Sequence, residues 1–300
     1  GYNFNDENAG AIQTSPSFGS IISRTYGANS ITGIPNYIVL SKIFGQQSAF
    51  LGNAYNPFTF DDEGKKSLSL NVEKIRFEDR KKVLELLDNK FNKDRATSII
   101  GEHKQQAFNI LRGNIADTFE VKNEPEAIQK LYGEKTFPKQ LMLARRLIEG
   151  GAKFVSVIHG GWDLHSDIKA GHERLVPEVD FGISRLLQDL YDKGMLENTL
   201  VVVSTEFGRT PLNNGSGDSK IPGRDHAPTL TPLLLAGGNY IGQGALGKVD
   251  TNGHAVTDKP YYPVDLLYTI LNHMGMDAKL QFTDFAGRPR FILEGEAKLI

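Results

Sequence analysis

The sequence predicts an α/β protein with a mostly parallel sheet and helices on both of its faces. Residues 154–158 form a short apolar run, and residues 199–204 form a continuous one, the pattern of a strand that is covered on both sides. An amphipathic helical stripe at 175–190 separates them, and strand–helix–strand at this spacing is typical of a unit with parallel strands. A third apolar run at 230–236 adds a strand, and residues 263–274 show helical periodicity.

The first 66 residues predict mixed and loop-rich structure. A short helix is expected from Ser15 and Pro16 onward over residues 15–22, and a strand is expected over 37–40. The stretch 48–64 is rich in Asn, Pro, Gly and Phe, and we expect a packed irregular loop there.

Residues 67–150 predict a helical region inside one domain that spans residues 1–300. Apolar side chains recur at helical spacing in four stretches, and two of these end at glycine. The expected helices cover residues 77–91, 95–112, 124–132 and 139–149.

Composition excludes several classes of protein. The net charge of −2 gives no reason to expect nucleic acid or an anionic membrane as a partner. No apolar run is long enough for a membrane span. The chain has no cysteine, which excludes disulfides, thiolate metal sites and a cysteine nucleophile within these residues.

Polar residues with metal-binding chemistry follow two of the predicted strands. The first strand runs into HGGWDLH, which contains Asp163 and His165, and the second runs into TEFGRT, which contains Glu206. Because parallel strands end at the same edge of a sheet, we expect these three side chains to converge. A carboxylate and an imidazole two residues apart suit Zn, Mn or Fe, whereas the alternative for D-x-H alone is a solvated loop.

A third polar stretch, PGRDHAP, precedes the last predicted strand. One of Asp225 and His226 is expected to bind the metal directly, and the other to support a ligand. Arg209 and Arg224 have the geometry to hold an anionic substrate group, and structural salt bridges are the alternative for both. His159 either lines the site or packs at the strand end.

GGWDLH, VVVSTEFGRTP and GRDHAP, in this order and spacing, resemble the bacterial family catalogued as domain of unknown function 1501. The resemblance extends from Pro125-Glu126-Ala127 to Asp284-Phe285-Ala286-Gly287-Arg288-Pro289, and thus over most of the chain. That family is described as sulfatase-like and related to the alkaline phosphatase superfamily. The resemblance implies an alkaline phosphatase-like domain in which Asp163, His165 and His226 match one metal set by order. The second metal's Asp-His pair is replaced here by Glu206-Phe207, so one or two ions, Zn or Mn, are expected.

The resemblance also implies an exported or periplasmic protein and a further amino-terminal segment that carries the nucleophile and one ligand. The given residues show no signal-peptide pattern. The expected function is metal-dependent hydrolysis of a small phosphate or sulfate ester. The alternative is a non-catalytic exported surface or binding protein with a degraded metal site. No catalytic residue is assigned, although Thr210 is the least implausible nucleophile, and the oligomeric state stays open.

Overall fold

The protein is a mixed α/β chain. The computed structural model describes residues 13–29, 31–42, 44–61, 115–213, 222–238, 240, 244–258, 260–293 and 295–300. Its helices are α1 (Phe18–Tyr26), η1 (Ala49–Leu51), η2 (Asn53–Tyr55), α5 (Ile115–Phe119), η3 (Val121–Asn123), α6 (Glu126–Tyr132), α7 (Thr136–Glu149), α8 (Ile168–Asp192), η4 (Leu196–Asn198) and α9 (Pro263–His273). Its strands are β1 (Tyr37–Val39), β2 (Phe58–Thr59), β3 (Phe154–Ser156), β4 (Val201–Ser204), β5 (Gly208–Arg209), β6 (His226–Ala227), β7 (Leu233–Ala236), β8 (Lys248–Val249), β9 (Val256–Asp258), β10 (Gln281–Thr283) and β11 (Pro289–Phe291).

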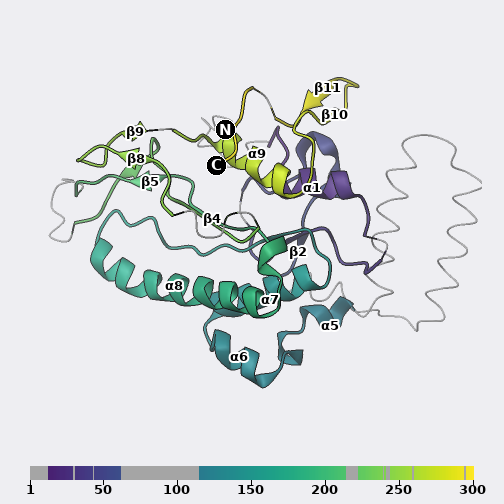
Figure 1. The fold of residues 1–300 in the computed structure, drawn as a ribbon, viewed down its shortest axis with the longest axis horizontal. Coiled ribbons are helices and arrows are strands. Elements are labelled where there is room, and N and C mark those ends of the chain that lie inside the picture. The colour runs from purple at the N-terminus through teal and green to yellow at the C-terminus, as the bar shows by residue number, and fades with distance from the viewer. Residues whose placement is uncertain are drawn as a thin grey trace, which may run out of the picture.

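One parallel sheet has the strand order β2-β1-β3 and lies between helices. Ile38 in β1 is paired with Phe58 on one side and with Val155 on the other. Successive side chains of a strand point to opposite faces. The side chain of Ile38 packs with α7 residues in one buried cluster, whereas the Tyr37 ring lies against Gly19 of α1. In Figure 1, α7 and α8 accordingly lie on one side of the strands, and α1 and α9 lie on the other.

The strand β4 is paired with β7 in a separate, antiparallel sheet. Val202 faces Leu235 in the register of this pair. Val201 belongs to a buried cluster that includes residues of α7 and α8, and Val202 packs against the cluster that contains α9 residues. Strand β4 is therefore covered on both faces, as its continuous apolar run predicted.

The predicted parallel pairing of 154–158 with 199–204 is wrong. Strand β3 pairs with β1, whereas β4 pairs with β7, and β5–β6, β8–β9 and β10–β11 are also antiparallel. Among the described residues, therefore, the expected mostly parallel sheet is not found. The reason is physical: ladder hydrogen bonds are made by the backbone, so an apolar run records that a strand is covered but not its direction or its neighbour.

The predicted elements themselves are largely confirmed where the structure describes them. The helices expected near 15–22, 124–132, 139–149, 175–190 and 263–274 are α1, α6, α7, α8 and α9, and the strands expected near 37–40, 154–158, 199–204 and 230–236 are β1, β3, β4 and β7. The stretch 48–64 is less irregular than expected, because it contains η1, η2 and β2. The helices expected over 77–91 and 95–112 lie outside the described residues.

A buried ion network joins α7 to its surroundings. The guanidinium of Arg145 is fully buried and bonds Glu124 at 2.7 Å, Asp189 of α8 at 2.8 Å and Glu149 at 2.6 Å. The Tyr132 hydroxyl donates to Asp189 at 2.9 Å. The network therefore fixes how α6, α7 and α8 meet.

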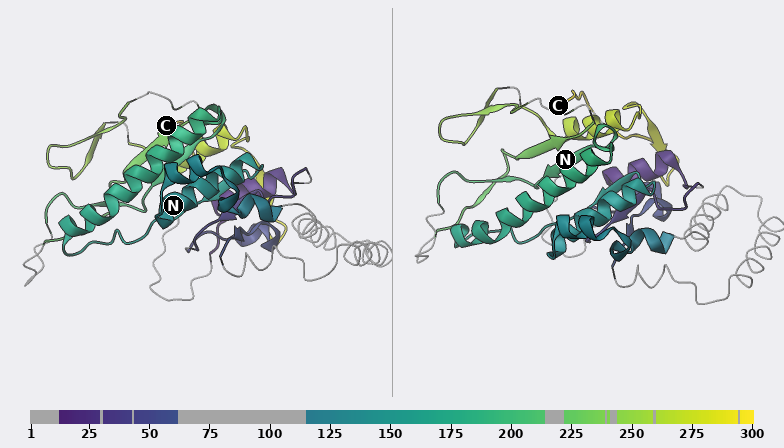
Figure 2. Two further views of the ribbon diagram at one scale, coloured as in Figure 1. Left: turned by 90° about the horizontal axis from the view of Figure 1, so that it is seen from below. Right: turned by 60° about the horizontal axis from the view of Figure 1, so that its bottom comes forward.

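The long helix α8 carries the chain from the polar loop after β3 back to the core. Its first turns, β5 and the β8–β9 hairpin lie toward the same end of the molecule in all views (Figures 1 and 2). None of the helices in the described part of the chain has the length and apolarity needed to cross a membrane.

Candidate metal centre

The first ligand-bearing segment is the loop between β3 and α8. Gly161 has a φ of 92°, a left-handed value that favours glycine, just before Trp162. The Trp162 indole Nε1 donates to Nδ1 of His159 at 3.0 Å, and the His159 ring packs on Phe137 with centroids 4.5 Å apart. His159 therefore packs near the end of the strand and supports Trp162, the second of its two predicted roles.

The second segment is the short antiparallel pair β5–β6. In its register Arg209 lies opposite His226, and Gly208 lies opposite Ala227. A Cβ at position 208 would lie 2.5 Å from the carbonyl oxygen of Leu230, so the close approach of these chains requires glycine there.

A backbone seam joins the two segments, and we define it as residues 164–168 lying against residues 222–224. Ser166 and Pro222 form an antiparallel bridge. The Arg224 amide donates to the Leu164 carbonyl at 3.1 Å, and the Ile168 amide donates to the Pro222 carbonyl at 3.2 Å. A Cβ at Gly223 would lie 2.1 Å from the carbonyl carbon of His165, so only glycine fits there without a shift of the chain.

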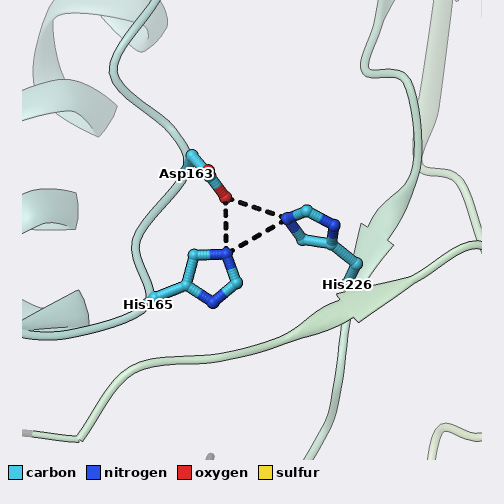
Figure 3. A group of neighbouring side chains, drawn as sticks. All are labelled: Asp163, His165 and His226. Carbon is cyan, nitrogen blue, oxygen red and sulfur yellow. Dashed lines mark hydrogen bonds and ion pairs between the residues drawn. The ribbon is translucent and has the colours of Figure 1, made fainter. Parts of the chain in front are cut away.

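This seam brings together Asp163, His165 and His226, which we call the triad (Figure 3). The His165 Nε2 lies 3.0 Å from Asp163 Oδ1, the His226 Nε2 lies 2.9 Å from the same oxygen, and the two nitrogens are 3.2 Å apart. The side chains are 66%, 47% and 43% exposed for Asp163, His165 and His226. The triad is thus an accessible group of three potential ligand atoms.

The triangle has the dimensions of a metal site. Ligand atoms ~2.0–2.1 Å from one ion lie about 3.3 Å apart in tetrahedral geometry and about 2.9 Å apart in adjacent octahedral positions. The measured edges of 2.9, 3.0 and 3.2 Å fall in this range. Two imidazoles and a carboxylate are also a donor set that Zn and other divalent transition metals accept. The residues present therefore fit such an ion.

Asp225 lies behind the triad, where it contacts His165. Its Oδ1 is 3.2 Å from His165 Nδ1. A carboxylate at Nδ1 is the common partner of a metal-ligating histidine, and it would leave Nε2 of His165 to face an ion at the triad. Of the two predicted alternatives, His226 joins the triad and Asp225 takes the supporting role.

The two arginines bond protein acceptors. The Arg209 Nη2 donates to Asp163 Oδ1 at 2.7 Å, and Arg224 Nη1 donates to the Thr210 carbonyl at 2.9 Å. The pKa of Asp163 is lowered to about 2, mainly by the hydrogen bond with His226 and then by the one from Arg209, with the charges of His165 and Arg209 adding to the effect. Asp163 is therefore ionised at neutral pH, as a metal ligand must be.

Glu206 is exposed just after β4, and β4 pairs with β7 and not with β3, so no shared parallel edge brings Glu206 to the triad. Among the described residues, one group of three or more His, Cys, Asp or Glu side chains has ligand atoms within 4.8 Å of one another, and Glu206 is not in it. The next residue, Phe207, packs its ring on His226 with centroids 4.3 Å apart. A second-metal role for Glu206 stays a prediction.

The hydroxyl groups near the site bond the backbone. Ser204 donates to the Thr205 carbonyl at 3.1 Å, and Thr205 donates to the Phe207 carbonyl at 2.8 Å. Thr210 donates to the Leu212 carbonyl at 3.0 Å and accepts the Asp225 amide at 3.1 Å. Thr210 therefore supports Asp225, and its role as a nucleophile stays a prediction.

Sequence reasoning missed the structural roles of Gly223 and Phe207. From the sequence PGRDHAP, Gly223 receives no role, although glycine can signal the close approach of two backbones. The sequence around Phe207 gives no indication that its ring packs on the imidazole of His226.

Fold and site together define a mixed α/β protein with an exposed carboxylate and two imidazoles that fit a divalent metal. The chain belongs to the family described as Protein of unknown function (DUF1501), which matches residues 5–300. Neither a curated protein nor a solved structure matches the chain. Because the family description states no activity, a function has to be argued from the site.

Proposed function

We propose that the triad binds one divalent transition metal and that the protein is a metal-dependent hydrolase of phosphate or sulfate esters. The observation that carries the proposal is the triangle of Asp163 Oδ1, His165 Nε2 and His226 Nε2, with edges of 2.9 to 3.2 Å. Hydrogen bonds and an ion pair with Arg209 hold these exposed side chains together, and the same spacing suits a shared ion.

The class of reaction is supported by the sulfatase-like resemblance of the three motifs and by the chemistry of the donor set. A bound ion of this kind supplies Lewis-acid polarisation of an ester oxygen. The exposure of the triad leaves room for a small anionic ester, and Zn or Mn suits the ligands. An alkaline phosphatase-like fold is part of this proposal. We propose one ion because Phe207 covers His226 and Glu206 is not grouped with the triad.

The test is to titrate Zn and Mn into the full chain and to measure bound metal by calorimetry and elemental analysis. We expect one ion per chain, and Asp163→Asn or His226→Ala should reduce affinity at least about tenfold, because each removes a direct ligand. His172→Ala is the matched control, since His172 is exposed on α8 outside the triad. Equal binding by all four proteins would exclude the triad as the site.

Aryl phosphate and aryl sulfate hydrolysis should then be assayed with the metal-loaded protein. We expect little turnover by the given chain, because the family resemblance places the nucleophile in a further amino-terminal segment. Turnover by a longer form should be lost with His226→Ala and kept with His172→Ala. A longer form with further amino-terminal residues belongs in the same assay, because the family resemblance implies that a nucleophile lies there.

A second candidate is an exported surface or binding protein that takes up the metal without turnover. The observation that favours it is that Ser204, Thr205 and Thr210 all donate their hydroxyl hydrogens to carbonyl groups of the chain. Metal binding by the triad without hydrolysis by either form would favour this candidate. Metal-dependent turnover would rule it out.

A further inference from the structure

Arg209 contacts both segments that carry the triad. Its Nη2 donates to Asp163 Oδ1 at 2.7 Å and to the Trp162 carbonyl at 3.2 Å, both in the loop before α8. Its Nη1 donates to the Arg224 carbonyl at 3.4 Å, in the segment that leads to His226. The side chain is only 21% exposed. The guanidinium thus bridges two segments that lie far apart in the sequence.

His226 and the Phe207 ring that packs on it also lie next to Arg209. In the β5–β6 register, Arg209 is opposite His226. The guanidinium carbon lies 5.9 Å from the centroid of the Phe207 ring, and that ring packs on the His226 imidazole at 4.3 Å. A displacement of Arg209 would therefore change the positions of both Asp163 and His226.

These contacts require arginine rather than any cation. The planar guanidinium holds several donors in a fixed fork, so one side chain can serve acceptors on two segments. A lysine ammonium is a compact charge on a flexible stem, and it lacks the fork that spans separated acceptors. An Arg209→Lys variant therefore keeps the positive charge but loses the fork that holds the two segments, so it separates these two roles.

We infer that Arg209 is a positioning residue, which holds the Asp163 and His226 segments in register for metal binding rather than binding the substrate anion. This inference rests on the proposed metal site. Both Nη atoms of Arg209 already donate to protein acceptors, and an anion at Nη2 would have to compete with Asp163 and the Trp162 carbonyl. The positive charge of Arg209 by itself disfavours a nearby metal ion. Removing that charge should therefore raise metal affinity if Arg209 acts only as a charge, and lower it if Arg209 positions the ligands.

The first experiment is a titration of the metal-free full chain with Co²⁺, followed by its visible absorption. The variants are Arg209→Lys, Arg209→Met and, as a charge control, Arg174→Met on the exposed surface of α8. We expect both Arg209 variants to bind Co²⁺ about 10–100-fold more weakly, as for other groups that orient ligands, and the control to match the unaltered chain. Unchanged or tighter binding by Arg209→Met would overturn the inference.

Inorganic phosphate and sulfate should also be titrated into the metal-loaded proteins. Anion binding lost in Arg209→Met with unchanged Co²⁺ affinity would show that Arg209 is an anion-binding residue instead. Urea unfolding of each metal-free variant gives the stability, so a general loss of folding is recognised separately from a loss of metal affinity.

A metal-free measurement keeps this inference apart from the proposed function. The Arg224 amide donates across the seam to the Leu164 carbonyl, so its hydrogen exchange reports whether the two segments stay together. We expect exchange at least about tenfold faster in both Arg209 variants than in Arg174→Met, as local opening becomes easier. If the unaltered chain binds no metal but the Arg224 amide exchanges faster in the Arg209 variants, the metal site is excluded and the positioning role of Arg209 is kept. If exchange in these variants is unchanged, the positioning role is excluded.

Discussion

Arg145 in α7 and Asp163 in the loop before α8 both bond several charged or polar partners, but their surroundings differ. The Arg145 guanidinium is fully buried, and its partners Glu124 and Asp189 are 7% and 1% exposed. Asp163 is 66% exposed, and its partners include two histidines and one arginine. One group lies between packed helices, and the other lies between loops.

Burial explains the first group but not the second. A buried charge is costly unless an opposite charge lies beside it, so the carboxylates around Arg145 have to gather there. Water can hydrate each member of the triad separately, and desolvation therefore gives no reason for three ligand atoms to lie within 4.8 Å. The contrast teaches that convergence of polar groups points to a ligand chiefly where solvent would have allowed them to separate.

The largest expected effect is a loss of stability when the buried Arg145 network is broken. Arg145→Met should destabilise the protein by about 3–5 kcal/mol, because Glu124 and Asp189 lose their partner inside the core. Urea unfolding followed by circular dichroism measures the change. Lys139→Met removes an exposed partner of Glu134 and should change stability by less than about 1 kcal/mol. Similar losses in both variants would show that burial does not set the strength of the Arg145 network.

An intermediate effect is expected at the seam that assembles the triad. Gly223→Ala places a Cβ 2.1 Å from the His165 carbonyl carbon, so the chains must separate at a cost of about 1–3 kcal/mol. Metal affinity should fall with it, because His226 follows Gly223 on the same segment. Calorimetric metal titration and urea unfolding check both effects.

The matched control lies in the other segment. A Cβ at Gly160 meets no atom within 4 Å, so Gly160→Ala should change stability by less than about 0.5 kcal/mol and leave metal affinity unaltered. If Gly223→Ala behaved like Gly160→Ala, the seam would not be what positions the triad.

The smallest expected effect is on the pH dependence of stability, through Glu149, the half-exposed partner of Arg145. Burial by itself raises the pKa of Glu149, but hydrogen bonds from Lys193 and Arg145 lower it below its ordinary value of 4.5. A carboxyl with a lowered pKa in the folded state contributes stability above pH 4.5, and this contribution is lost as the pH falls through the folded pKa.

The stability of the unaltered chain should therefore decrease as the pH falls below about 4.5, and Glu149→Gln should flatten part of that decrease. Because Glu149 is 46% exposed, the difference should stay below about 1 kcal/mol. Urea midpoints between pH 3 and 7 measure it. Parallel pH curves for the two proteins would show that Glu149 does not contribute.

The longer helices and the residues of the triad could be predicted from sequence, but the way the strands pair could not. Helical periodicity is local, so α7 and α9 follow from the spacing of their own apolar residues. The partner of β4 is set by long-range packing, and its apolar run is compatible with either direction.

The triad was therefore expected for a partly mistaken reason. Asp163 and His165 were placed by the edge of a parallel sheet, whereas an antiparallel seam that depends on Gly223 brings them to His226. Nor could the sequence choose between the two roles of Arg209. That choice depends on acceptors such as the Trp162 carbonyl, which every residue carries and no sequence pattern marks.

The seam also bears on the order in which the molecule folds. Asp163 and His226 are 63 residues apart in the chain, whereas Asp163 and His165 stay two residues apart even when the chain is unfolded. The short-range pair can hold an ion weakly before folding, and any such binding reduces the net stabilisation that the metal confers. The third ligand arrives only after a long loop has closed, a step that non-local contacts make slow. An ion at the proposed site would therefore gain its third ligand only after the seam has closed, and it would lengthen the lifetime of that closed seam.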